Sequence, residues 1–475
     1  MKQFFKYFSA LAFSILLASC NTSIWTPDGK DDPEDPSNPS NPSNPSSSAD
    51  PDYFWDMDAL PEITLEVPLA EWNTLLGNFD KDNKTKEYIH CDVTFKKGSD
   101  VFTVKDAGMR MRGNTSRRRP ESGGSGHISG NTDWHHFHIG LNFHKFNKDK
   151  EHKIKGINRV NLKWFNNDPS YVREVFCFDL FRRAGVWTAA RESFCRVYIH
   201  VTGDDKPAYY GVYAMIEPYD NKYLERNAES YGNKITGNLW KCTYPSSPAD
   251  LRSADDWLFG QDDNMHDYTY ELKETGADFA TAKAQIQDFI KKLNGKGEES
   301  FKKWIAEVCD VELLLRTYAV NVAVGMWDDY WNNGNNYYLY FDSQDLLSYK
   351  VYMLPYDYDN TLGTSNCYDP ATRNPLDWGD KGDLIERLLR FDDYRKIYVD
   401  CLKELVAPGS GLMDYESASL RINLWHQKIQ PYISNDTGED MEIKDQPAGW
   451  SNYHYPILGD GGYLKTKANT INSLK

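Results

Sequence analysis

The spacing of apolar residues changes along this chain from a period of two to a period of three or four. In the first half, residues 63–67 and 88–95 alternate apolar and polar side chains, as half-buried strands do. In the second half, residues 279–293 and 311–324 repeat apolar side chains at helical spacing. Strands followed by helices predict a two-lobed α+β fold, with a β-rich N-terminal lobe and an α-rich C-terminal lobe.

The remaining elements follow the same order. Residues 195–201 and 209–216 predict a hairpin, and residues 136–143 predict a strand whose polar face carries His136 and His138. In that position the two histidines would be solvated or hydrogen-bonded. Further elements are expected as one helix at 171–184, strands at 336–341 and 349–354, and helices near 384–390, 394–406 and 415–428.

The N-terminus has the features of a secretory signal. Lys2 and Lys6 flank the start of an apolar run that is short for a membrane span. The run ends in Leu17-Ala18-Ser19-Cys20, which resembles the lipobox of bacterial lipoproteins. Residues 1–19 are therefore expected to be a signal peptide and Cys20 the site of lipidation. A plain signal peptide with an incidental cysteine is the alternative.

A low-complexity segment separates this signal from the folded part. Residues 20–52 are rich in Asp, Pro, Ser and Asn, and they bury too little apolar surface to offset the entropy of ordering. We expect a tether here, followed by one large domain at 53–475. No other segment is long enough to span a membrane, so the lipid would be the only anchor, on a cell-envelope membrane facing the periplasm or the cell surface.

The net charge argues against nucleic-acid binding, and the cysteine pattern argues against a disulfide framework or a cysteine-bound zinc site. The net charge of −16 argues against a nucleic-acid partner, which requires a basic surface. No cysteine forms a Cys-x-x-Cys pair, and an odd number follows Cys20. We expect mostly buried thiols, with one disulfide still open, at Cys91, Cys177, Cys195, Cys242, Cys309, Cys367 and Cys401.

Two acidic turns flank the predicted strand pair of the second half. Asp328 follows the helix at 311–324, and Asp357 directly follows the second strand. Both turns leave the same end of a short hairpin, so we expect Asp328, Asn336 and Asp357 to lie close together. Phosphoryl transfer requires such a set: one carboxylate for the acceptor hydroxyl, and oxygen ligands for a divalent metal on the phosphates.

Several blocks of this sequence resemble the spore-coat CotH kinase family. They span about residues 63–405 in the family's order, which leaves 406–475 as a C-terminal helical extension. The blocks are Arg112-Gly113-Asn114-Thr115-Ser116, Asn161-Leu162-Lys163, Asp168-Pro169-Ser170-Tyr171-Val172-Arg173-Glu174, Tyr210–Glu217, Asn238-Leu239-Trp240-Lys241, Trp327–Tyr340 and Pro355–Gly363.

The resemblance implies an atypical protein-kinase-like fold that uses ATP with Mg²⁺ or Mn²⁺ and phosphorylates a protein acceptor. It implies Asp328 as the catalytic aspartate and Asp357, Asn336 and Asp359 around the metal. The phosphates would meet basic residues among Lys163, Lys241, Arg110 and Arg112, with Glu217 orienting one of the lysines. The sequence departs from the family at Asn335, where histidine is frequent, and it has no standard Gly-rich loop.

Other interpretations remain open at this stage. The segment 357–360 could be a calcium loop, although Tyr368 occupies the position of the bidentate glutamate. His127, His135, His136 and His138 could hold zinc. Trp327, Trp331 and the tyrosine-rich hairpin could stack on sugar rings in a glycan-binding or carbohydrate-active protein. A catalytically inactive kinase-like scaffold is the fourth alternative.

Overall fold

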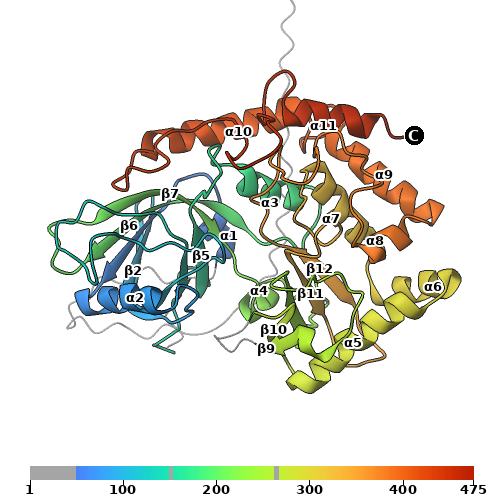
Figure 1. Ribbon diagram of the computed structural model, residues 1–475, viewed down its shortest axis with the longest axis horizontal. Helices are drawn as coiled ribbons and strands as arrows, with labels where there is room; N and C mark the ends of the chain where they lie inside the picture. The colour runs from blue at the N-terminus through green and yellow to red at the C-terminus, as the bar shows by residue number, and fades with distance from the viewer. Residues whose placement is uncertain (1–49, 149–152, 262–266) are drawn as a thin grey trace, which may run out of the picture. The chain divides into compact units, whose positions relative to one another are not determined.

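The structure is a computed structural model that describes residues 50–148, 153–261 and 267–475. The expected signal peptide at 1–19, the expected lipidation site Cys20 and most of the expected tether lie outside the described residues. The predicted α+β class is confirmed, because the described chain combines β-sheets with helices (Figure 1). Within these ranges, no helix has both the length and the apolar character that crossing a bilayer requires.

Seven strands form a closed barrel in the order β1-β2-β3-β4-β5-β7-β6. The strands β1 and β6 close it in parallel, and every other neighbouring pair is antiparallel. Their bounds are β1 Glu62–Val67, β2 Ile89–Lys97, β3 Asp100–Met111, β4 Ile139–Asn142, β5 Arg159–Lys163, β6 Glu192–Val201 and β7 Ala208–Ile216. Alternation predicted strands in this half, but not their closure.

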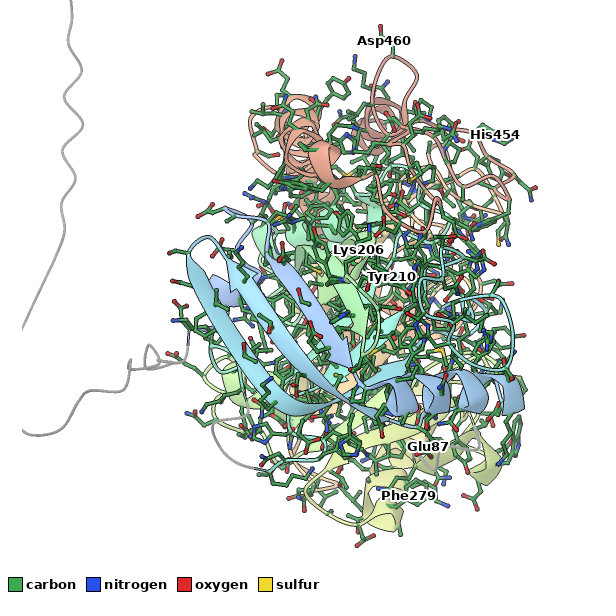
Figure 2. The ribbon with its side chains drawn as sticks, turned by 90° about the vertical axis from the view of Figure 1, so that its left-hand side faces the viewer. Glu87, Lys206, Tyr210, Phe279, His454 and Asp460 are labelled. Atoms are coloured by element: carbon green, nitrogen blue, oxygen red, sulfur yellow. The ribbon has the colours of Figure 1, made fainter. Side chains whose placement is uncertain are left out.

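The barrel has its own hydrophobic core. In β1 every second side chain is buried, as the alternating pattern predicts. Helix α2 (Leu69–Lys81) adds Trp72, Leu75 and Leu76 to this core. Figure 2 faces the barrel, and Tyr210, labelled there, is fully buried in the same core. This core holds the barrel strands in place, including β3 and β5, which carry the expected site residues Arg110 and Lys163.

A second sheet of five strands has the order β12-β11-β8-β10-β9. The hairpin of β11 and β12 was predicted, but its extension by three earlier strands was not. In this sheet Lys241 of β8 pairs with Tyr338 of β11, which brings two distant family blocks together. The strands are β8 Asn238–Cys242, β9 Phe259–Gln261, β10 Tyr270–Thr275, β11 Tyr337–Phe341 and β12 Val351–Pro355.

Helices pack around this second sheet and supply a larger core. Helix α7 begins after Asp310, whose side chain accepts the Leu313 N–H at 3.0 Å, and Gly325 follows it at φ 74°. Besides α2, the helices are α1 Pro51–Trp55, α3 Arg173–Arg183, α4 Asn221–Arg226, α5 Phe279–Gly295, α6 Glu298–Val308, α7 Val311–Ala323, α8 Asp383–Leu388, α9 Asp392–Val406, α10 Tyr415–Ile429 and α11 Tyr463–Asn472, with short 3-10 turns at Asp256–Leu258 and Gln430–Tyr432.

His136 and His138 are hydrogen-bonded, which is one of the two alternatives expected for them, but they are not solvated. Strand β4 covers only part of this segment, and His136 and His138 are both 3% exposed. They are buried because His138 stacks on Trp164, while the late residues Glu439 and Asp440 lie against His136. A two-residue period identifies the two faces of a strand, but it does not show what covers the polar face.

The expectation of buried thiols is confirmed. Six described cysteines are buried, Cys367 is exposed, and all seven are free. No disulfide therefore links the cysteines of the described chain, and the fold is held by its cores and hydrogen bonds.

Candidate active site

Two neighbouring turns form the centre of the site. Asp328 lies in the loop after α7, Asn336 precedes β11, and Asp357 follows β12. The pairing of Tyr337 with Pro355 holds both turns at one end of the hairpin. Asn336 and Asp357 have φ of 55° and 63°, a left-handed conformation that non-glycine residues adopt infrequently. Such strain concentrates at functional sites.

Three amide side chains orient the Asp328 carboxylate. Asn333 donates to it at 2.6 Å, Asn335 at 3.0 Å and Asn336 at 3.1 Å. Burial raises the pKa of Asp328 and the nearby Asp357 charge raises it further, whereas the amide donors lower it. The net shift is upward, which makes this carboxylate a better proton acceptor than a solvated aspartate.

A largely buried ammonium group lies among three carboxylates. Lys163 of β5 contacts Glu174 of α3 at 2.7 Å, Asp359 at 3.1 Å and Asp357 by a short hydrogen bond. Burial lowers the pKa of Lys163, but the charges of Asp357, Asp359 and Glu174 together raise it well above its ordinary value. Lys163 is therefore a permanent cation in this cluster.

The same carboxylates form a candidate metal group. Oxygen atoms of Glu174, Asp357 and Asp359 lie within 4.8 Å of one another, and these are the only three such ligands gathered within the described ranges. Burial would raise the pKa of Asp357, but Lys163 holds it below its ordinary value. Burial raises the pKa of Asp359 to about 8. Hard oxygen donors of this kind suit Mg²⁺ or Mn²⁺.

Glu192, at the start of β6, lies close enough to this cluster for the charges of Glu174 and Lys163 to act on it. Both of its carboxyl oxygens are buried and have no hydrogen-bond partner within the described residues. Burial, followed by the Glu174 charge, raises the pKa of Glu192 well above its ordinary value. A carboxyl group in this environment resists ionisation.

Further positive charge lies beside the metal group. The Nζ atom of Lys241 is 5.3 Å from the ring centre of Tyr356, and its pKa responds to the charges of both Arg112 and Asp357. Arg112 and Lys241 are therefore close enough for their charges to interact, and Asp357 lies within the same range of Lys241. Arg110 is placed differently, because its guanidinium lies over the Tyr88 ring and donates to the Met111 carbonyl.

The model of a family described as CotH kinase protein matches residues 109–457. The chain belongs to the CotH kinase family. A search of curated proteins finds no match.

The CotH match includes every expected site residue from Arg110 to Asp359. It begins within β3, so β1 and β2 of the barrel precede it, and it extends well beyond residue 405. Membership of this family indicates a kinase-like protein. The closed barrel, however, differs from the N-terminal lobe of a typical two-lobed kinase.

One expected CotH site assignment is wrong, and one residue has to be added to the site. Glu217 does not contact either lysine, because its carboxylate pairs with Arg191 at 3.3 Å and Arg226 at 2.7 Å. Glu174 takes that place instead, in the first turn of α3. The signal for it was present in the sequence: a glutamate at the start of the helix that follows the Lys163 strand.

The structure also bears on the alternative interpretations. Trp327 is 8% exposed and Trp331 is 1% exposed, so neither side chain presents an open face for sugar stacking. The four histidines do not form a group of zinc ligands in the described part of the chain. Their imidazoles bond instead to carboxylates, backbone groups and hydroxyls, as His127 does with Glu121 and Asp204.

Proposed function

We propose that the chain is an ATP- and divalent-metal-dependent phosphotransferase that phosphorylates a protein acceptor. The observation that carries the proposal is the contact of Lys163 with Glu174, Asp357 and Asp359 beside the amide-oriented carboxylate of Asp328. A lysine on a strand, a glutamate on the next helix and a later metal-binding aspartate are the parts from which kinases assemble a triphosphate site. On this reading the barrel and the helical part act as the two lobes of a kinase-like fold.

Asp357, Asp359 and Glu174 would hold the metal, with the Asn336 side-chain oxygen as a further donor. A bound Mg²⁺ or Mn²⁺ would neutralise charge on the triphosphate oxygens. Lys163 would then replace some of its contacts with carboxylates by contacts with phosphate oxygens. Arg112 and Lys241 would bind other phosphate oxygens. Arginine offers the bidentate geometry that phosphate favours.

Asp328 would act on the acceptor. The acceptor hydroxyl oxygen forms a bond to the γ-phosphorus, the bond from that phosphorus to the β–γ bridging oxygen breaks, and ADP leaves. The hydroxyl proton passes to the Asp328 carboxylate, whose raised pKa favours its acceptance. The three amide donors keep the carboxylate in the orientation that this step needs.

We also propose that the protein is tethered to a cell-envelope membrane. The sequence features at Cys20 and in the 20–52 segment support lipid attachment followed by an extended spacer. Labelling cells with an alkyne-tagged fatty acid would test it: wild type should carry the tag, and Cys20→Ala should not. Equal labelling of the two proteins would refute attachment at Cys20.

The decisive experiment supplies the full chain with γ-labelled or α-labelled ATP, with and without Mg²⁺ or Mn²⁺. We expect metal-dependent incorporation from the γ label alone. Incorporation from the α label would show nucleotidyl transfer and contradict the proposal. Metal-dependent ATP binding without any incorporation would identify a kinase-like scaffold instead.

Two variants assign the roles. Asp357→Ala should abolish metal-dependent nucleotide binding, while Asp328→Ala should retain binding and lower transfer by about 10²–10⁴-fold. The control is Asp392→Ala, which removes a carboxylate that is 98% exposed on α9 and should change neither quantity. Equal transfer by wild type and both site variants would end these assignments.

A further inference from the structure

One buried histidine near the phosphate-binding residues has an unused hydrogen-bond donor. His138 precedes β4 and is 3% exposed, with its imidazole stacked on the Trp164 ring at 4.4 Å between centres. Its Nδ1 atom accepts the Trp164 backbone N–H at 3.2 Å. Its Nε2 atom is buried and has no hydrogen-bond partner among the described residues.

The contact with Trp164 fixes the tautomer. An Nδ1 atom that accepts a hydrogen bond carries no proton, so the proton of the neutral ring is on Nε2. Burial, followed by the charges of Lys163 and Arg112, holds the pKa of His138 well below its ordinary value. The ring is therefore neutral at physiological pH, and its Nε2–H group is a donor.

The unused edge of this ring faces the Arg112–Gly113 turn. The Cδ2 atom, which is bonded to Nε2, lies 3.1 Å from the place that a Cβ on Gly113 would occupy. The Arg112 backbone N–H donates to the His138 carbonyl at 2.9 Å. Gly113 has φ of 99° and no side chain, so the turn passes close to the imidazole. The donor thus lies beside the residues expected to bind phosphate.

We propose that the Nε2–H group of His138 donates a hydrogen bond to a phosphate oxygen of the bound nucleotide. The proposal rests on the proposed function, because it requires the phosphates to lie between Arg112 and Lys163. Buried donors are nearly always satisfied, and a phosphate oxygen is an acceptor that this environment favours. A neutral donor would orient the phosphate group without adding to the positive charge of Lys163, Lys241 and Arg112.

Binding measurements on His138→Phe test the proposal, since phenylalanine keeps the stacking on Trp164 and removes the donor. With Mg²⁺ present, we expect ATP to bind about tenfold more weakly than to wild type, and adenosine to bind equally well. His136→Phe is the matched control, because the Nε2 atom of this equally buried histidine is used by the Tyr210 carbonyl. It should leave ATP affinity unchanged.

Three outcomes overturn the proposal. ATP affinity unchanged in His138→Phe would show that the donor is not used, and an equal loss for ATP and adenosine would show a structural role. Failure of wild type to bind ATP would remove the proposed function as well. Wild type that binds and transfers phosphate, with an unaffected His138→Phe, removes this inference alone.

A measurement on the wild-type protein avoids any effect of the variant on folding. In a ring-¹⁵N histidine spectrum, the His138 signals, assigned by their loss in His138→Phe, should report an Nε2–H tautomer. The Nε2 signal should shift when ATP and Mg²⁺ are added, and adenosine should leave it in place. An Nδ1–H tautomer, or no response to ATP, contradicts the proposal.

Discussion

Two lysines of this protein, one largely and one fully buried, meet opposite electrostatic environments. Lys163 lies among three carboxylates, and its pKa is raised well above the ordinary value despite burial. Lys467 of α11 is fully buried, donates to the Pro370 carbonyl at 2.9 Å, and lies 4.3 Å from the Trp378 ring centre. Burial lowers the pKa of Lys467 to about 7.

The difference shows what the candidate site adds to burial. A buried ammonium loses its proton unless carboxylates offset the loss of hydration. No carboxylate lies within ion-pairing distance of Lys467 in the described part of the chain, whereas Lys163 contacts three. The fold therefore keeps the Lys163 side chain charged at the site, whereas it favours loss of the proton from the Lys467 side chain of α11. Each region predicts the behaviour of a different variant.

The largest effect is expected from Lys163→Met. This change leaves the buried Glu174 and the partly exposed Asp357 and Asp359 without their cation, so the free energy of unfolding at pH 7.5 should fall by about 3 kcal/mol, the low end of the cost of breaking a buried pair. Because the raised pKa of Lys163 places its contribution below pH about 10.4, the loss should be present across the neutral range. Urea unfolding measures it.

Added Mg²⁺ provides the internal check on Lys163→Met. The divalent cation should restore part of the lost stability, since it can take the place between Glu174, Asp357 and Asp359. A variant that is as stable as wild type without Mg²⁺ would break the comparison, because the carboxylates would then not depend on the lysine.

A smaller effect of opposite sign is expected from Lys467→Met. The unfolded chain binds a proton that the folded chain gives up between pH about 7 and 10.4, so wild-type stability should rise with pH across this window. Linkage puts the penalty of the buried amine at about 4–5 kcal/mol at pH 6, and loss of its hydrogen bond to the Pro370 carbonyl offsets about 2 kcal/mol of the gain. Lys467→Met should therefore raise the free energy of unfolding by about 2–3 kcal/mol at pH 6 and give no gain near pH 10.4.

Thermal unfolding at pH 6 and at pH 10 measures this dependence. The matched control is Lys465→Met on the same helix, where the lysine pairs with the exposed Asp460 and is itself exposed to solvent. It should produce little change at either pH. A gain for Lys467→Met of the same size at both pH values would show that its titration is not responsible.

The smallest effect is expected from Glu192→Gln, which mimics the protonated side chain. The raised pKa of Glu192 means that wild type loses stability as pH rises above about 4.3, where the unfolded glutamate ionises. The variant should be more stable than wild type by about 1 kcal/mol at pH 8 and equal to it near pH 4. Denaturant midpoints at the two pH values test this; equal stability at pH 8 would show that Glu192 ionises without cost.

Local features of this fold could be predicted from the sequence, because local chemistry determines them. The helix after Asp310 and the β11–β12 hairpin are examples: capping and alternation involve residues close in sequence. The approach of Asp328 to Asn336 followed from the same hairpin. The kinase interpretation of the sequence rested on these local features.

Features that depend on distant segments could not be predicted. The pairing of Lys241 with Tyr338 joins strands almost a hundred positions apart, and the sequence of neither strand identifies its pairing partner. Glu174 reaches Lys163 only through the packing of α3 against the barrel strands. His138 is buried by Trp164 and other residues around it. The alternating pattern of residues 136–143 carries no information about these neighbours.

The parallel pairing of β1 with β6 has a consequence for how the protein folds during synthesis. His200 and Glu66, which meet across this pair, are 134 positions apart in the sequence. The first strand therefore leaves the ribosome long before the strand that completes its ladder exists. Contacts of such long range slow folding. One edge of β1 must stay unpaired until residue 201 has emerged, so a nascent chain halted earlier cannot complete the barrel.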